Sequence, residues 1–137
     1  MKRLVEHCYT AREGQHIQPG RRLSLQGSEL AHHVVDLLVD RQASDVVLLD
    51  LTSLSTFTDY FVIATADNER QLNALIETLD GAASAAGLPF RQEGSPEGGW
   101  VLIDLGTVIA HLFSLEKRAY YNLEGLWRRA QEVVRVQ

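Results

Sequence analysis

Two short apolar segments separated by two residues constrain the fold of this chain more than any other feature. Residues 100–105 and 108–113 are both strand-like, and Gly106-Thr107 lies between them. A glycine at the first of two turn positions is the signature of a type II′ hairpin. The sequence therefore predicts two antiparallel strands joined by a tight turn at residues 106 and 107.

This turn decides which side chains share a face of the hairpin. One face is wholly apolar and is expected to be core; its cross-strand pairs are Leu105 with Val108, Ile103 with Ala110, and Val101 with Leu112. The other face mixes aromatic, aliphatic and ionisable groups; its pairs are Asp104 with Ile109, Leu102 with His111, and Trp100 with Phe113. Such a mixture is typical of an interface core with a polar edge. The pattern is equally compatible with a face that a helix covers, which would leave the two ionisable residues at its margin.

The segments before the hairpin predict two helices and two buried strands. Ser28 is a candidate N-cap for a helix over residues 29–42, which carries one apolar stripe. Residues 46–51 and 60–65 are continuous apolar runs typical of strands buried on both faces. The eight residues between these strands are too few for a crossover helix, so we expect the strands to be antiparallel.

Asp67 is the expected N-cap of a second, longer helix, which is expected to end at Gly87 and Pro89. Gly81 in its interior costs about 1 kcal/mol relative to alanine, which a close approach of the helix to the sheet would explain. A short strand is expected near residues 90–92, and helices are expected over residues 115–121 and 123–134. The prediction is one α/β domain over residues 28–137, a mixed β-sheet with flanking helices.

Charge divides the chain into two parts. Residues 1–27 contain five Lys/Arg and two Glu, a net of +3, and lack sustained periodicity, which indicates a flexible basic tail. The remaining residues contain eight basic and sixteen acidic side chains, a net of −8. Because affinity for nucleic acid comes largely from clustered Lys/Arg, we expect no direct binding of RNA or DNA. A basic protein surface would suit the domain better.

The apolar runs are far shorter than the roughly 20 residues of a membrane helix, so we expect a soluble protein. The single cysteine, Cys8, cannot form an internal disulfide, which fits a reducing compartment. A cysteine-based zinc site within one chain is excluded for the same reason.

A search for catalytic chemistry finds no convincing set of residues. His32 and His33 are adjacent, and neighbours in a helix point in different directions, so they do not form a metal clamp. His111 could approach Asp104 across the hairpin, but no nucleophile motif accompanies them. The glycine-rich residues 94–99 lack the Lys-Ser/Thr of a phosphate-binding loop. The sequence therefore predicts no catalytic residue, no metal site and no cofactor.

A further candidate for a two-metal site is a set of three carboxylates: Asp50, Asp59 and Asp104. Such a site needs carboxylates that converge within a few ångströms, and the positions of these three do not compel convergence. The triplet Asp67-Asn68-Glu69 lies at a helix start, where acidic groups are favoured by the helix dipole.

Five stretches of the chain resemble the ribosomal silencing factor family, also called the Iojap family. They occur in the family's order and span nearly all of residues 28–128; they are Asp45-Val-Val-Leu-Leu-Asp50, Ser55-Thr-Phe-Thr-Asp-Tyr-Phe-Val-Ile-Ala-Thr65, Trp100-Val-Leu-Ile-Asp-Leu-Gly106, Val108-Ile-Ala-His-Leu-Phe113 and Arg118-Ala-Tyr-Tyr-Asn-Leu-Glu-Gly-Leu-Trp127.

The resemblance implies a fold similar to the nucleotidyltransferase core without its catalytic motif. It also implies a cytoplasmic protein, with no cofactor, that binds the large ribosomal subunit through its ribosomal protein number fourteen. Members of the family keep the subunits apart in this way and repress translation when nutrients are scarce. A metal-dependent enzyme of the nucleotidyltransferase type is the alternative. An exposed aromatic face is also compatible with a homodimer that shields it.

The resemblance places the partner-binding surface at seven residues: Trp100, Asp104, Leu105, Gly106, Thr107, Arg118 and Tyr121. Trp100 is the expected anchor, because buried tryptophans are common interface hot spots. Two positions depart from the family pattern. Thr107 stands where the family usually has Asp, which puts a carboxylate contact in doubt, and Ala66 stands where a glycine is typical.

Overall fold

The computed structural model describes residues 27–54 and 58–137. Within them the helices are α2 (Gly27–Asp40), α3 (Glu69–Ala86), α4 (Leu115–Tyr121) and α5 (Leu123–Leu126). The strands are β1 (Ser44–Asp50), β2 (Tyr60–Ala66), β3 (Arg91–Ser95), β4 (Trp100–Asp104), β5 (Val108–Ser114) and β6 (Gln131–Val136). Apart from Gly27, the predicted tail and its Cys8 lie outside the described residues.

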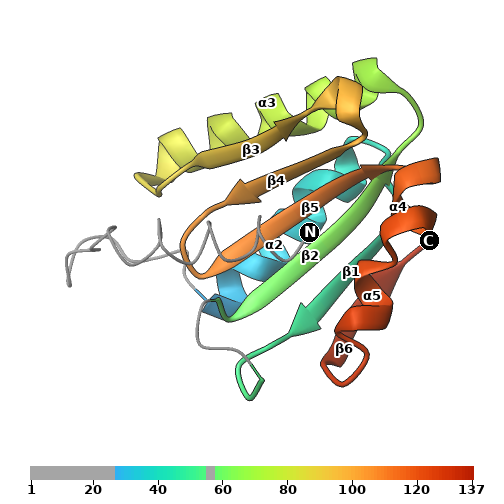
Figure 1. The fold of residues 1–137 in the computed structure, drawn as a ribbon. Coiled ribbons are helices and arrows are strands. Elements are labelled where there is room, and N and C mark those ends of the chain that lie inside the picture. Colours follow the sequence, from blue (N-terminus) through green and yellow to red (C-terminus); the bar gives the residue numbers. More distant parts are fainter. Residues whose placement is uncertain (1–26, 55–57) are drawn as a thin grey trace.

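The six strands form one mixed sheet in the order β3-β4-β5-β2-β1-β6 (Figure 1). Strands β2 and β5 are parallel, and every other neighbouring pair is antiparallel, including β1 with β2 as predicted. Helices α2 and α3 cover one face of the sheet, here called the first face, while α4 and α5 lie on the opposite or second face. The predicted mixed sheet with flanking helices is confirmed.

The hairpin has the predicted register. Trp100 pairs with Phe113, the pairing continues to Asp104 with Ile109, and the Leu105 N–H donates to the Val108 carbonyl at 2.9 Å. Gly106 has φ +100°, a conformation that a residue with a Cβ rarely adopts. The apolar face of the hairpin lies against α2 and α3 in a core of Leu, Val, Ile and Ala side chains, as expected.

Both predicted N-caps are wrong. Helix α2 begins at Gly27, so Ser28 lies inside its first turn, and the Gly27 N–H instead donates to Thr107 Oγ1 from the hairpin turn. The cap of α3 is Asn68, one residue after Asp67, and its side chain accepts from the Gln71 N–H at 2.8 Å. The start of α2 could not be read from the local sequence, because the side chain that accepts the Gly27 hydrogen bond, Thr107, lies 80 residues away.

The C-cap of α3 is Gly87, as predicted, in the left-handed conformation with φ +69°. The proposed reason for Gly81 is wrong, because a Cβ placed there would meet nothing within 4 Å. Ala66 ends β2 without a left-handed backbone, so the strand accommodates this departure from the family pattern.

The predicted last helix is wrong beyond residue 126. Helix α5 ends at Leu126, and the chain returns as β6, which pairs with β1 along the edge that would otherwise be open. Val133, Val134 and Val136 are β-branched and suit a strand. No helix in the described part of the chain is long and apolar enough to cross a membrane.

Candidate partner-docking site

The seven predicted docking residues lie at two separate ends of the hairpin. Trp100 begins β4, and Asp104 ends it, so about 13 Å of extended strand separates them at roughly 3.3 Å per residue. Trp100, Arg118 and Tyr121 are grouped at the end next to α4, here called the α4 end. The other four lie at the turn end, from Asp104 to Thr107. The structure therefore does not bring the seven residues together.

Aromatic rings dominate the α4 end. Trp100 stacks on Phe113 with ring centroids 5.2 Å apart, and its ring lies 4.6 Å from that of Tyr121. Tyr121 in turn meets Tyr120 edge to face at 5.0 Å. Trp100 is only 7% exposed, whereas Tyr120 is 74% exposed. The contacts form a continuous path from the solvent to the centre of the second face.

The sequence pattern did not predict the exposed part of the α4 end as part of the docking surface. Leu115 and Tyr120 are 75% and 74% exposed, and the Lys117 ammonium lies 5.5 Å from the centre of the Tyr120 ring. We call Leu115, Tyr120 and the half-buried Tyr121 the α4 patch. Leu115 and Tyr120 are five residues apart and so lie on different sides of this short helix, but both present large apolar surfaces to solvent, as protein-binding surfaces often do. Of the predicted docking residues on α4, Arg118 and Tyr121, neither belongs to the most exposed part of this helix.

Arg118 faces inward instead, and it is 7% exposed. Its guanidinium donates to the Asp45 carbonyl at 2.6 Å and to Thr65 Oγ1 at 2.8 Å. It also makes a two-pronged pair with Glu124, with both N···O distances 3.0 Å. All of these partners lie within the domain, so Arg118 fixes the orientation of α4 against β1 and β2.

Arg135 on β6 completes this charge network. It contacts Asp45 Oδ1 at 2.6 Å and Glu124 Oε2 at 3.2 Å. The hydrogen bond from Arg118 is the largest cause that lowers the pKa of Glu124, and the charge of Arg135 acts in the same direction. The network joins α4, α5, β1 and β6, which places the α4 patch on a rigid support.

The loop before β4 holds the start of α4 in place. Ser114 caps α4, because its Oγ accepts from the Lys117 N–H at 3.2 Å. The Ser114 N–H donates to the Gly99 carbonyl at 2.9 Å, and Gly99 has φ +79°. A Cβ on Gly99 would come within 2.6 Å of the Lys117 side chain, so only glycine allows this close approach.

The turn end is held from within the domain. Asp104 is fully buried, and its Oδ1 accepts from the Gly106 N–H at 2.8 Å. Leu105 belongs to the first-face core. The Thr107 carbonyl accepts from the Thr58 hydroxyl at 3.0 Å. Among the four predicted residues here, Thr107 alone is half-exposed.

His111 is buried in the centre of the second face. Its Nδ1 accepts from Trp100 Nε1 at 3.2 Å, which assigns the ring proton to Nε2, and Phe61 packs edge to face at 4.4 Å. Burial lowers the pKa of His111 to about 3. The imidazole is therefore neutral near pH 7, and its partner is Trp100 rather than Asp104.

The other candidate ligands have local structural partners. Asp50 accepts hydrogen bonds from the Thr52 N–H at 2.9 Å and from the Thr52 hydroxyl at 2.6 Å. His32 Nδ1 lies 2.9 Å from the Ser28 carbonyl. Over residues 27–54 and 58–137, no group of three His, Cys, Asp or Glu side chains is placed to hold a metal ion.

Sequence comparison places this arrangement in a known class of regulatory proteins. The profile of the family described as "Ribosomal silencing factor during starvation" matches residues 24–137. This match covers most of the chain, and the chain therefore belongs to the ribosomal silencing factor family.

Individual relatives agree with this assignment. A ribosomal silencing factor of Halalkalibacterium halodurans is 37% identical over 110 residues, which are 80% of this chain and 94% of the relative. The mouse protein named mitochondrial assembly of ribosomal large subunit protein 1 is 29% identical over 115 residues, 81% of this chain and 50% of that protein. A crystal structure of a Bacillus halodurans protein is similar with a TM-score of 0.69 and 38% identity, and the match covers 79% of this chain and 99% of that one.

Proposed function

We propose that this protein binds the large ribosomal subunit through its ribosomal protein number fourteen, blocks joining of the subunits, and represses translation under nutrient limitation. Family membership supports a ribosomal role, and the name of the mouse relative refers to the large subunit. The observation that carries the docking step is the exposed α4 patch, backed by the aromatic contacts of Trp100. The protein acts in the cytoplasm, where its partner is found.

The α4 end is the better docking surface of the two ends of the hairpin. Leu115 and Tyr120 present apolar area to solvent, whereas Asp104 and Leu105 are buried. In this proposal Tyr120 and Tyr121 contact the partner, and Trp100 supports Tyr121 from below. Arg118, Asp104 and Gly106 act indirectly because they hold α4 and the turn in shape.

The mechanism is steric and needs no cofactor. The names of the relatives describe silencing rather than catalysis. A buried, neutral His111 is a poor general base near pH 7. The similarity to the nucleotidyltransferase core remains a prediction.

Sedimentation with isolated ribosomal subunits tests the proposal. The protein is expected to migrate with the large subunit and to reduce formation of joined ribosomes. The double substitution Leu115→Ala and Tyr120→Ala should weaken binding by at least about tenfold, since truncating interface anchors often costs 2 kcal/mol or more. Both side chains are exposed, so the variant should remain folded, which a thermal melt verifies.

Val133→Ala provides a matched control, because Val133 is an exposed apolar residue on β6. It should bind as the unchanged protein does. Failure of the unchanged protein to sediment with the large subunit at any salt concentration would refute the proposed function. Normal binding by the double variant would instead move the docking surface away from the α4 patch.

We also propose that the free protein forms a homodimer that shields the α4 patch. Self-association and ribosome binding would then compete. Analytical ultracentrifugation of the unchanged protein and of the Leu115→Ala, Tyr120→Ala variant tests this point: the variant should be monomeric at concentrations where the unchanged protein is dimeric.

A further inference from the structure

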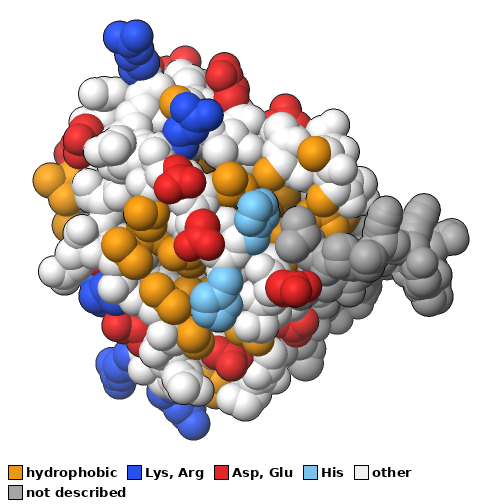
Figure 2. Space-filling model, turned by 180° about the vertical axis from the view of Figure 1, so that it is seen from behind, with side chains coloured by type: hydrophobic (Ala, Val, Ile, Leu, Met, Phe, Trp, Pro, Cys, Tyr) orange, Lys and Arg blue, Asp and Glu red, His pale blue; other side chains and the backbone are white. Residues whose placement is uncertain are grey.

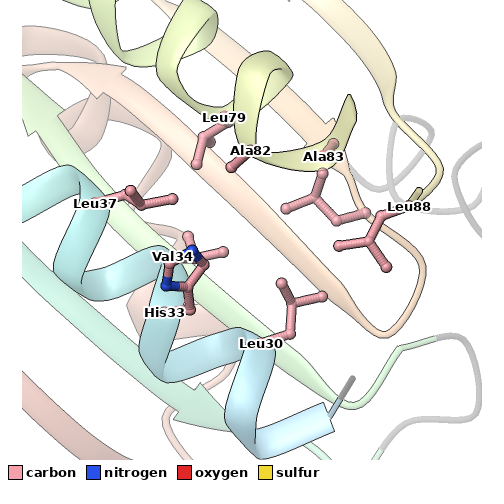
Figure 3. Close-up of a pocket in the computed structure, with 9 residues that line it drawn as sticks. Leu30, His33, Val34, Leu37, Leu79, Ala82, Ala83 and Leu88 are labelled. Carbon is pink, nitrogen blue, oxygen red and sulfur yellow. The ribbon is translucent and has the colours of Figure 1, made fainter. Parts of the chain in front are cut away.

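A shallow apolar groove runs between α2 and α3, on the side of the sheet opposite the α4 patch (Figure 3). Its sides are formed by Leu37 and His33 from α2 and by Leu79 and Ala82 from α3, and Leu88 closes one end. Leu37, Ala82 and Leu88 are partly exposed, so the groove is open to solvent. Figure 2 shows the same face, with apolar side chains between acidic ones.

An acidic ridge borders the groove along α2. Glu29, Asp36 and Asp40 are seven and four residues apart, which places them on one stripe of the helix next to His33 and Leu37. All three are exposed, and none has an ion-pair partner in the described part of the chain.

The α3 side of the groove is formed by Leu79 and by two small side chains, Ala82 and Ala83. Ala82 is half-exposed, so a partner can approach this wall closely. Gly81 does not line the groove: it is exposed, and it lies two residues from both Leu79 and Ala83, which places it on the opposite side of the helix.

We propose that this groove binds a basic amphipathic helix of another protein. Apolar side chains of that helix pack on the exposed parts of Leu37, Ala82 and Leu88, and its Lys or Arg side chains meet the ridge of Glu29, Asp36 and Asp40. An apolar groove with charges complementary to the helix is a recurring mode of helix recognition. The acidic ridge disfavours RNA, whose phosphates it would repel.

This site is separate from the α4 patch and does not rest on the proposed ribosomal function. The two surfaces lie on opposite faces of the sheet. A protein docked at α4 would therefore leave the groove accessible, so that one molecule could hold two partners.

The proposal is tested with a fluorescent synthetic helix of Leu and Lys, about five turns long, and a matched helix with Glu in place of Lys. Fluorescence anisotropy measures affinity, and amide chemical shifts locate the bound helix. The Lys helix should bind at least about tenfold more tightly than the Glu helix. Its shifts should cluster at Leu37, Ala82 and Leu88.

Two variants separate the groove from general charge attraction. Ala82→Gln places a bulky, uncharged side chain on the α3 wall of the groove, and the pair Asp36→Asn with Asp40→Asn removes most of the ridge; each should weaken the Lys helix at least about tenfold. Neutralising two exposed acidic residues outside α2 and α3, Glu97→Gln with Glu116→Gln, should change affinity less than about twofold. Circular dichroism verifies that all variants are folded.

Equal affinity of the two helices, an effect of the control as large as that of Asp36 and Asp40, or shifts confined to α4 would each overturn the proposal. Tighter binding of an RNA oligonucleotide at the groove would overturn it as well. Analytical ultracentrifugation gives a further test: if Ala82→Gln abolishes a dimer, a second copy of the chain occupies the groove, and the proposal is wrong.

Discussion

The two faces of the sheet are built from different chemistry. The first-face core, under α2 and α3, consists of aliphatic side chains such as Val34, Leu75 and Ile103. The second face carries the large aromatic residues together with Thr65, Asp104, His111 and Arg118, four of the five buried polar or charged side chains in the described part of the chain. One face is held by non-directional burial, and the other also needs specific hydrogen bonds.

This difference indicates which face sets the geometry of docking. Aliphatic packing tolerates volume-conserving exchange, so it stabilises the sheet without fixing one orientation of its neighbours. Buried polar groups lose free energy unless their partners stand in the right places. On the second face these groups fix α4 through Arg118 and the end of the hairpin through Trp100 and His111. The polar face therefore positions the α4 patch, and four predictions test this comparison.

The largest effect is expected for Arg118→Ala. The change leaves Glu124 and the Asp45 carbonyl without their buried donor, and loss of one member of a buried pair typically costs about 3–5 kcal/mol. Urea unfolding should show this loss. Arg135→Ala, which removes a more exposed arginine from the same network, should cost about 1 kcal/mol or less. Similar losses for the two variants would contradict a buried anchor at Arg118.

The second prediction concerns pH. The folded-state pKa of His111 is about 3, below the value of 6.5 expected in the unfolded chain. Between these values the unfolded state binds more protons, so stability is complete above about pH 6.5 and falls as the pH decreases. The free energy of unfolding should decrease by about 2 kcal/mol between pH 7.5 and pH 5, at about 1.4 kcal/mol per pH unit.

The control for this prediction is His111→Asn, which keeps an acceptor near Trp100 but does not titrate. Its stability should depend less on pH over the same range, as measured by urea unfolding at each pH. Glu124 contributes at lower pH only: its pKa is lowered from 4.5, so its contribution is lost as the pH falls through the folded-state value. A pH dependence unchanged by His111→Asn would show that another group is responsible.

The third prediction compares one conservative change on each face. Trp100→Phe removes the N–H that donates to His111, and an unsatisfied buried acceptor costs about 1–2 kcal/mol in addition to the lost ring area. Ile103→Leu on the first face conserves volume and should cost about 1 kcal/mol or less. Chemical unfolding measures both. The contrast fails if the leucine variant is the less stable of the two.

Patterns in the sequence predicted the first face and the hairpin well, because alternation with period two and a Gly-containing turn are local signals. They failed where a partner is distant in sequence. The burial of Arg118 depends on Asp45 and Thr65, which are 73 and 53 residues away. No local pattern indicates that an arginine in an amphipathic segment faces inward, and the exposure of Leu115 and Tyr120 was missed for the same reason.

Strand β6 was missed for a related reason. The helical spacing predicted a shared face of Leu123, Leu126, Trp127 and Ala130; three of these pack against the second face, but Leu126 is 63% exposed. The spacing could not show that the chain turns after Leu126 or that β1 offers an edge for pairing. An edge strand is determined by its neighbour in the sheet, and the order of the sheet cannot be read from one segment.

The smallest effect is expected at Thr107, which joins the two faces at the turn end. Thr107→Val removes the acceptor for the Gly27 N–H at the start of α2 and should cost about 0.5–1 kcal/mol. Thr107→Asp keeps an acceptor and adds a negative charge near that helix N-terminus, so it should stabilise the domain by about 0.3–1 kcal/mol. Urea unfolding of both variants measures whether the first loses and the second gains free energy of unfolding.

Thr107→Asp also decides whether the family's usual carboxylate at this position acts on the partner or on the fold. If its role is to cap α2, the substitution raises stability and leaves affinity for the large subunit within about twofold. A tighter complex with unchanged stability would mean that the turn end contacts the partner directly. The α4 patch would then be one of two contact regions, and the turn end could no longer be treated as purely structural.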